Sequence, residues 1–287
     1  MSPLLLLVIA AVVAFAIYKS SAFKRWRYSK DLTFPEVPKR ADLLFGYYGC
    51  ADEQANETLD HVNLFWEHQV DGVDKASQNI LLMSRTTVLD LSAQMFTRTG
   101  DKGPFTLRDD ALVHVMALFQ HLSATGALKY VKFLCPIDEP NNTVANETVL
   151  LAAIKVVFDA ASQFIELRGV RLACIYAADK PFICQELFAL VGFDDYDMKS
   201  HVLVSHKYLT LVESLRPGQQ IMLVPGGCYG QDPAPFVNFA QANAEVGAIV
   251  CFLWYDNKTG TVGAPGIRSG PLRAAYREAG RSVCAIS

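Results

Sequence analysis

The sequence predicts an α/β protein with a (β/α)8 TIM barrel, and three observations support that prediction. Short apolar runs alternate with segments of helical periodicity eight times along the chain. The alternation covers roughly 250 residues, the usual length of one such barrel. No GxGxxG or P-loop pattern follows any strand candidate, which argues against the open nucleotide-binding sheets. Several helix candidates are short, so we expect the barrel to be irregular.

An uncharged apolar segment, residues 3–18, opens the chain, and five basic residues follow it within residues 19–30. We expect residues 1–22 to be a retained transmembrane anchor, because a signal peptide carries its positive charge before the apolar run. A cleaved signal peptide is the alternative. By the positive-inside rule the main domain then lies in the cytoplasm. Residues 23–40 read as a basic, proline-containing linker, and residues 41–287 as the barrel domain.

The strand candidates are short apolar runs that end in glycine, an acid or an aromatic residue. The fourth is the plainest, because it stops abruptly at Asp138 and Glu139, as a buried parallel strand does where it opens into a polar loop. The eight candidates cover residues 43–48, 61–66, 87–93, 131–137, 170–176, 190–193, 220–225 and 246–254.

Helix candidates separate most of these strands. Thr106 is placed to cap one helix and Gly169 to stop another. Strands that alternate with helices predict a parallel sheet covered by helices. The candidates cover residues 73–83, 107–124, 147–166, 181–189, 201–215, 235–243 and 272–279.

Composition excludes several classes of function. A formal net charge of -3 lacks the basic excess of a nucleic-acid-binding protein. The seven cysteines form no CxxC pair, which argues against a zinc ribbon or a redox motif. Cys135, Cys174 and Cys251 lie inside apolar runs, so we expect buried thiols. The HxH pattern of metal-dependent barrel hydrolases is missing, and we expect neither a metal nor a cofactor.

Acids and aromatic residues gather at the predicted carboxyl ends of the strands, where barrels place their active sites. Such a set suits a glycosidic bond, because one carboxylic acid protonates the leaving oxygen and a second carboxylate acts as base, nucleophile or charge stabiliser. The expected catalytic residues are Glu139, Asp138, Asp195 and Asp194. The residues expected to bind the carbohydrate substrate are Tyr48, Glu67, Tyr176, Asp197, Tyr229 and Trp254.

The run Asp138-Glu139-Pro140 and the position of Trp254 resemble the (β/α)8 glycoside hydrolases with paired catalytic glutamates, whose fourth strand ends in Asn-Glu-Pro. The resemblance implies that Glu139 is the acid/base and that Trp254 lies at the end of the eighth strand. The chain departs from the family at the seventh strand, which ends at Gly226 in place of a nucleophilic glutamate. A second carboxylate is then expected from the cluster Asp194, Asp195 and Asp197.

The adjacent acids also resemble hexosaminidases that use substrate assistance. That resemblance implies that Asp138 orients an acetamido group of the substrate and Glu139 protonates the leaving oxygen, so that no enzyme nucleophile is needed. The DxxDxDxE run of family 18 chitinases is absent.

The sequence is therefore consistent with two classes of function. One is a membrane-anchored glycoside hydrolase that uses carboxylate acid/base catalysis. The other is a non-catalytic barrel that binds a carbohydrate or a partner and lacks the second carboxylate. Residues 138–140 also suit a helix start or a turn, and Trp254 also suits barrel packing. A sugar-phosphate isomerase or aldolase ranks below both, because Lys180 is the only lysine close to a strand end.

Overall fold

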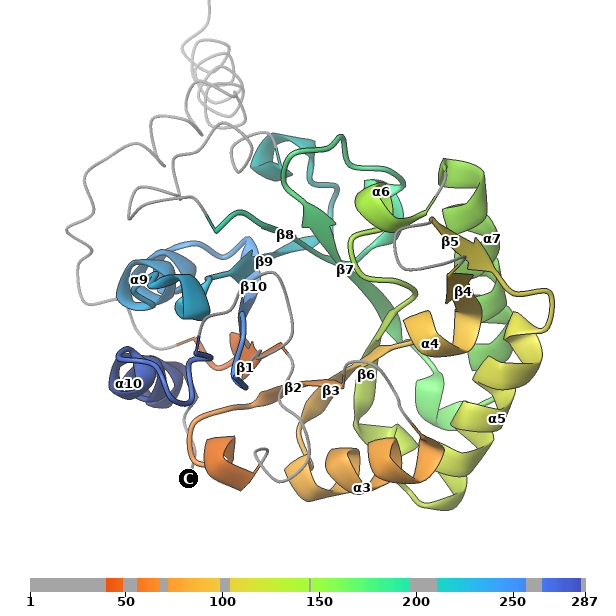
Figure 1. The fold of residues 1–287 in the computed structure, drawn as a ribbon, viewed down its shortest axis with the longest axis horizontal. Helices are drawn as coiled ribbons and strands as arrows, with labels where there is room; N and C mark the ends of the chain where they lie inside the picture. The colour runs from red at the N-terminus through yellow and green to blue at the C-terminus, as the bar shows by residue number, and fades with distance from the viewer. Residues whose placement is uncertain are drawn as a thin grey trace, which may run out of the picture.

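Eight parallel strands form one sheet that curls into a nearly closed barrel (Figure 1). Their order is β1-β10-β9-β8-β7-β6-β3-β2, and the two edge strands β1 and β2 lie side by side. The predicted barrel is confirmed. The computed structural model describes residues 40–48, 56–67, 72–98, 104–144, 146–196, 211–256 and 265–284.

Every predicted strand is a strand of this barrel. Neighbouring strands pair in parallel, as where β8 and β9 run in register from Leu190 opposite Gln220 to Asp194 opposite Val224. The strands are β1 (Leu44–Tyr47), β2 (Leu64–Glu67), β3 (Thr86–Asp90), β6 (Val131–Cys135), β7 (Arg171–Ala177), β8 (Leu190–Asp194), β9 (Gln220–Val224) and β10 (Val246–Cys251).

The side chain of Asn63 links the two edge strands. Its Oδ1 accepts a hydrogen bond from the Phe45 N–H at 2.6 Å, and its Nδ2 donates to the Leu43 carbonyl oxygen at 3.0 Å. The strands come very close here, since a Cβ on Gly46 would lie 2.3 Å from the carbonyl oxygen of Leu64. Only glycine permits that approach, so Gly46 and Asn63 together bring the barrel to near closure.

Side chains of alternating size fill the barrel interior. Trp66, Phe133 and Met222 lie among the small residues Ala173 and Ala248, and all of them are buried. The interior is therefore a packed core and not a pore, as in other barrels of this size.

Helices cover the outside of the barrel. In Figure 1, α5 and α7 lie to the right of the strands, α9 and α10 lie to the left, and α3 lies below them. Helix α7 begins after Asn146, whose Oδ1 caps it by accepting a hydrogen bond from the Val149 N–H at 3.2 Å. The long helices are α3 (Val73–Met83), α5 (Ala111–Ala124), α7 (Glu147–Ala161), α9 (Ala234–Ala242) and α10 (Arg273–Val283).

Several predicted helices differ from the structure in their bounds. The helix predicted from residue 107 begins at Ala111, because Thr106, its expected cap, and Leu107 belong to a short strand. The helix predicted to reach residue 166 ends at Ala161, and a 3-10 turn, η3 (Ile165–Leu167), follows it. The helix predicted at residues 181–189 is only the 3-10 turn η4 (Gln185–Leu187). Most of the helix predicted at residues 201–215 lies outside the described residues, and residues 211–214 are helical.

A hairpin that the sequence did not predict projects from the loop after β3. Its strands, β4 (Phe96–Arg98) and β5 (Phe105–Leu107), pair antiparallel, and the rings of Phe96 and Phe105 meet edge to face. Each strand has three residues, which is too short for an alternating pattern to stand out from the polar loop.

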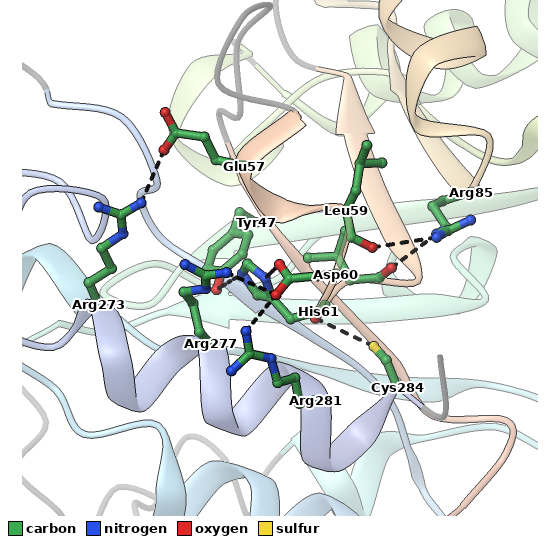
Figure 2. A network of polar contacts seen from close by, with 11 residues as sticks. Tyr47, Glu57, Leu59, Asp60, His61, Arg85, Arg273, Arg277, Arg281 and Cys284 are labelled. Carbon is green, nitrogen blue, oxygen red and sulfur yellow. Dashed lines mark hydrogen bonds and ion pairs between the residues drawn. The ribbon is translucent and has the colours of Figure 1, made fainter. Parts of the chain in front are cut away.

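A polar network fastens the segment before β2 to helix α10 (Figure 2). His61 is fully buried; its Nδ1 donates to Asp60 at 2.7 Å, and its Nε2 lies 3.0 Å from the Tyr47 hydroxyl. Asp60 also pairs with Arg277 at 2.8 Å and with Arg281 at 2.5 Å, both on α10. Burial lowers the pKa of His61, which favours a neutral imidazole that donates to Asp60 and accepts from Tyr47.

The predicted anchor, residues 1–22, lies outside the described residues, and so does the predicted linker except for Arg40. In the part of the chain that the structure describes, no helix is long and apolar enough to cross a membrane. The three cysteines predicted to be buried, Cys135, Cys174 and Cys251, are buried free thiols.

Candidate active site

The loop after β6 brings two adjacent acids to the carboxyl end of the barrel. The strand ends at Cys135, and Glu139 adopts a left-handed conformation with φ 46° and ψ 55°, just before the short helix α6 (Pro140–Thr143). This bend ends the alternation of a strand, in which neighbouring side chains would point to opposite faces. The Glu139 N–H donates to the Ile175 carbonyl oxygen of β7 at 3.0 Å and fixes the bend. Asp138 and Glu139 therefore both reach the mouth of the barrel.

Asp138 is held by a tyrosine from the inside of the barrel. Tyr48 follows β1, and its hydroxyl donates to Asp138 Oδ2 at 2.7 Å. Burial raises the pKa of Tyr48 well above its ordinary value, and the nearby charges of Asp138 and Asp90 add to the effect. The phenol thus remains a protonated donor, which favours the ionised form of Asp138.

Glu139 shares a hydrogen bond with Asp194, the last residue of β8. Asp194 is two residues beyond Gly192 and four beyond the inward-facing Leu190, so strand alternation turns it toward the mouth. Burial raises the pKa of Asp194 to about 8, with further contributions from the charge of Glu139 and its hydrogen bond. The carboxyl group of Asp194 is therefore largely protonated at neutral pH.

A row of aromatic rings borders these acids. Tyr196 stacks on Tyr229 with ring centroids 4.6 Å apart and on Phe252 at 5.0 Å. Phe252 in turn lies 5.6 Å from the ring of Tyr48. Tyr229 is 44% exposed and so offers part of its surface to a ligand.

The end of β9 carries no carboxyl group. Gly226 occupies the place where the resembling glycoside hydrolases have their nucleophile, and the ring of Tyr196 packs directly against it. A Cβ on Gly226 would lie 2.5 Å from Tyr196 Cδ1. Any side chain at this position would therefore have to displace the tyrosine.

Three residues expected to bind substrate lie on the outer side of the barrel wall. Glu67 is buried, with Asn79 of α3 3.5 Å from its carboxylate. Tyr176 is buried, and its hydroxyl donates to the Ile183 carbonyl oxygen. Trp254 is completely buried, with its ring centroid 4.6 Å from that of Tyr47. None of the three is at the mouth.

The structure separates two acids of the predicted cluster Asp194, Asp195 and Asp197. Asp194 joins Glu139, whereas the backbone of Asp195 accepts a hydrogen bond from Gln231 Nε2 at 3.4 Å. Asp197 lies outside the described residues.

Several residues at the mouth were given no role by the sequence. Asp90 ends β3, is 1% exposed, and accepts hydrogen bonds from the Ser92 N–H at 2.8 Å and hydroxyl at 2.5 Å. Its inward position follows from its two-residue spacing to the inward-facing Val88. Tyr196, Phe252 and Asn142 had no signal beyond their place after a strand. Within the described ranges no group of three or more His, Cys, Asp or Glu side chains is arranged to hold a metal ion.

No protein-family model and no curated protein sequence matches the chain. Solved structures do resemble it in fold. An FMN-binding β-glucuronidase from Facaelibacterium prausnitzii L2-6 has a TM-score of 0.54 and 10% identity, over 84% of this chain and 44% of its own. A β-glucuronidase from an uncultured Clostridium sp. has a TM-score of 0.53 and 12% identity, over 83% and 50% of the two chains. A GH2 β-galacturonidase from Eisenbergiella tayi has a TM-score of 0.52 and 9% identity, over 88% and 52%.

The fold is that of these glycoside hydrolase barrels. The chain spans about half the length of each of the three structures. At such low identity the likeness concerns the fold and does not extend to substrate or mechanism.

Proposed function

We propose that this barrel hydrolyses a glycosidic bond and that the Glu139–Asp194 pair supplies the proton to the leaving oxygen. The observation that carries the proposal is the raised pKa of Asp194, about 8, at the carboxyl end of a barrel strand. A general acid has to hold its proton at the working pH, and a buried carboxyl beside a second carboxylate does so. The partly exposed ring of Tyr229 supports the proposal by offering a face for a sugar ring.

The group that attacks the sugar carbon is a separate question. Retaining glycosidases place their two carboxyl groups about 5 to 5.5 Å apart, with the sugar between them. Glu139 and Asp194 share a hydrogen bond, so no sugar fits between them. Asp138 is the remaining carboxylate of the group, fixed by the Tyr48 hydroxyl at 2.7 Å. In this proposal Asp138 either attacks the sugar carbon itself or orients an acetamido group of the substrate that attacks it.

A non-catalytic carbohydrate-binding barrel is the second candidate. Gly226 favours it, because the place of the usual nucleophile is empty of carboxyl groups and is packed by the ring of Tyr196. Such a protein would bind sugars through its aromatic rings and leave them intact.

The test is turnover by the full-length chain in detergent on a broad panel of chromogenic glycosides. Glu139→Gln and Asp194→Asn remove the acid pair, and Glu186→Gln, at an exposed glutamate of η4, is the matched control. Turnover that survives in Glu186→Gln and disappears in the other two supports the enzyme. A folded wild type that binds oligosaccharides without turnover supports the binding barrel instead.

We propose further that residues 1–22 anchor the chain in a membrane, with the barrel on the cytoplasmic side. The support is the uncharged run at residues 3–18 and the basic residues after it. Resistance to alkaline carbonate extraction tests the anchor, and protease protection of sealed vesicles tests the side. Release into the soluble fraction would contradict the anchor.

A further inference from the structure

Three aromatic rings come together at the carboxyl ends of β8, β9 and β10, strands that lie side by side in the barrel (Figure 1). Tyr196 comes shortly after β8, Tyr229 ends the 3-10 turn η6 (Gly227–Tyr229) that follows β9, and Phe252 comes directly after β10. The plane of the Tyr196 ring is 16° from that of Tyr229 and 21° from that of Phe252. The three rings are therefore nearly parallel.

Tyr229 and Phe252 lie side by side over one face of Tyr196. Their planes differ by 12°, and their centroids are 6.4 Å apart. Rings on opposite faces of Tyr196 would be separated by two van der Waals spacings, about 7 Å in total, and could not come this close. Tyr229 and Phe252 thus form one continuous surface of two rings, with the Tyr196 ring packed on its back.

This two-ring surface depends on the missing side chain of residue 226. A Cβ on Gly226 would lie 2.5 Å from Tyr196 Cδ1 and 3.0 Å from Tyr229 Cδ2. The rings therefore fill the volume that a nucleophilic glutamate would need at the end of β9. The two-ring surface and a carboxylate at this position exclude each other.

The side chain of Gln231 ties the loops after β8 and β9 together. Gln231 is only 9% exposed, and its Oε1 accepts a hydrogen bond from the Gly226 N–H at 2.6 Å. Its Nε2 donates to the carbonyl oxygens of Asp195 at 3.4 Å and Tyr196 at 3.3 Å. The Tyr276 hydroxyl of α10 donates to the Gln231 carbonyl oxygen at 2.9 Å and fixes its backbone. One buried amide group thus holds both loops in place.

The two-ring surface leads outward from the acids of the mouth. Phe252 is at the inner end, 5.6 Å from the ring of Tyr48, whose hydroxyl donates to Asp138. Tyr229 is at the outer end and is 44% exposed. A pyranose ring is similar in size to an aromatic ring, and when its hydroxyls are equatorial its axial C–H bonds form an apolar face that suits the negative face of an aromatic ring. Two rings side by side match two consecutive residues of such a sugar chain.

We propose that Phe252 and Tyr229 bind two consecutive residues of a sugar chain with equatorial hydroxyls, and that Gln231 is the positioning residue of this surface. The assignment rests on the proposed function, because it names the substrate class of the same site. The ligand is then an oligosaccharide, and the second sugar residue adds affinity through Tyr229.

The test is a binding titration of the full-length chain in a detergent without sugar groups. The probes are cello-oligosaccharides and chito-oligosaccharides of one to four residues, measured by calorimetry and, for weak ligands, by ligand-observed NMR. Every variant carries Asp194→Asn, so that no probe is cleaved. In at least one series the dissociation constant should fall at least about tenfold from the monosaccharide to the tetrasaccharide. Tyr229→Ala should remove most of that gain, and Tyr229→Phe, which keeps the ring, should restore it.

Gln231→Leu should also remove most of the gain from chain length and leave the dissociation constant of the monosaccharide nearly the same, which a general loss of stability would not do. Gln219→Leu is the matched control and should keep the gain. Gln219 Nε2 donates to the carbonyl oxygens of Gln185 and Phe188, and its Oε1 accepts from the Arg216 N–H, but it precedes β9 at the opposite end of the barrel.

Equal affinity for short and long probes, no binding of either series, or an undiminished gain in Tyr229→Ala would overturn the two-ring surface. Equal effects of Gln231→Leu and Gln219→Leu would overturn the role of Gln231. The titration needs no turnover. Binding as expected by a wild type that cleaves no glycoside would count against the proposed hydrolysis alone, and cleavage without a gain from chain length would count against this inference alone.

Discussion

At the scale of single residues, the proposed chemistry depends on Glu139 and on the buried carboxyl group of Asp194, whose pKa is raised. The sequence predicted both Asp194 and Asp195 as catalytic residues, and strand alternation in the structure separates the two. The bend at Glu139 was harder to foresee. A left-handed glutamate before a proline has no strong sequence signal, yet it brings Asp138 and Glu139 to the same side.

Removal of either carboxyl of the pair should abolish most activity. General acid catalysis contributes roughly 10²- to 10⁴-fold, so we expect Glu139→Gln and Asp194→Asn each to lower kcat/KM by at least about 100-fold. Steady-state kinetics on one good glycoside measure the loss. Thermal unfolding of each variant checks that the fold is kept; a variant with near wild-type kcat/KM would show that its carboxyl is dispensable.

The raised pKa of Asp194 also predicts a pH-dependent stability. Its pKa is about 8 in the folded chain and near 3.8 in the unfolded chain, so the folded chain binds the proton more tightly. The free energy of unfolding should then fall as the pH rises through that window, by up to about 1.4 kcal/mol per pH unit for one proton. Asp194→Asn removes this slope. Urea unfolding at pH 5 and pH 8 should show the variant gaining stability relative to wild type at the higher pH, and equal slopes would contradict the burial of an uncharged acid.

At the scale of elements, the eight strands were predictable, but which of the two alternating faces of each strand lies inside the barrel was not. Apolar runs with polar ends mark buried parallel strands whatever their surroundings. Tyr176 and Trp254 were placed at the site because they end strands, but both face outward, where aromatic residues pack equally well. The β4–β5 hairpin was missed because short strands in a polar loop have no distinctive pattern.

The polar network around His61, which connects the segment before β2 to α10, should stabilise the barrel and have no role in catalysis. His61→Leu removes the hydrogen bonds to Asp60 and Tyr47 in a fully buried place, so we expect a loss of about 2 kcal/mol in the free energy of unfolding. Arg273→Met, which removes only a partly exposed ion pair with Glu57, should cost less than about 0.5 kcal/mol. Chemical denaturation measures both losses in the free energy of unfolding. Equal losses would show that the buried imidazole contributes no more to stability than the exposed ion pair.

Gly226 and Tyr196 should be coupled. Gly226→Ala places a Cβ against the tyrosine ring, so we expect a loss of about 1 to 3 kcal/mol of stability from overpacking. In a Tyr196→Ser background the same substitution should cost much less, because the ring is gone. A double-mutant cycle by urea unfolding measures the coupling, and additive effects would mean that the ring does not pack on the glycine in solution.

At the scale of the whole molecule, the sequence predicted the barrel, whereas the structure adds the negative charge at the mouth of the barrel. Length, alternation and missing phosphate-binding motifs together favour the barrel, because each is a property of the whole chain. Charge depends on which acids converge, and the sequence could not show that Asp90, Asp138, Glu139 and Asp194 act on the same few groups.

The acidic mouth predicts a substrate of neutral or positive charge. A uronate held about 6 Å from one of these carboxylates would lose about 3 kcal/mol at an effective dielectric constant of 20, roughly 100-fold in affinity. We therefore expect a glucoside or glucosaminide to be cleaved at least 100-fold faster than the matching glucuronide, unlike the β-glucuronidases that share the fold. Competition kinetics on matched substrates decide this, and a preference for the glucuronide would contradict it.

The most direct measurement compares two leaving groups in wild type and Asp194→Asn. A phenyl glycoside needs a proton on its leaving oxygen, whereas a 2,4-dinitrophenyl glycoside leaves without one. If the pair is the general acid, Asp194→Asn should lose at least about 100-fold in kcat/KM on the phenyl glycoside and less than about 10-fold on the dinitrophenyl glycoside. An equal loss on both substrates, or no loss on either, would contradict proton donation by this pair.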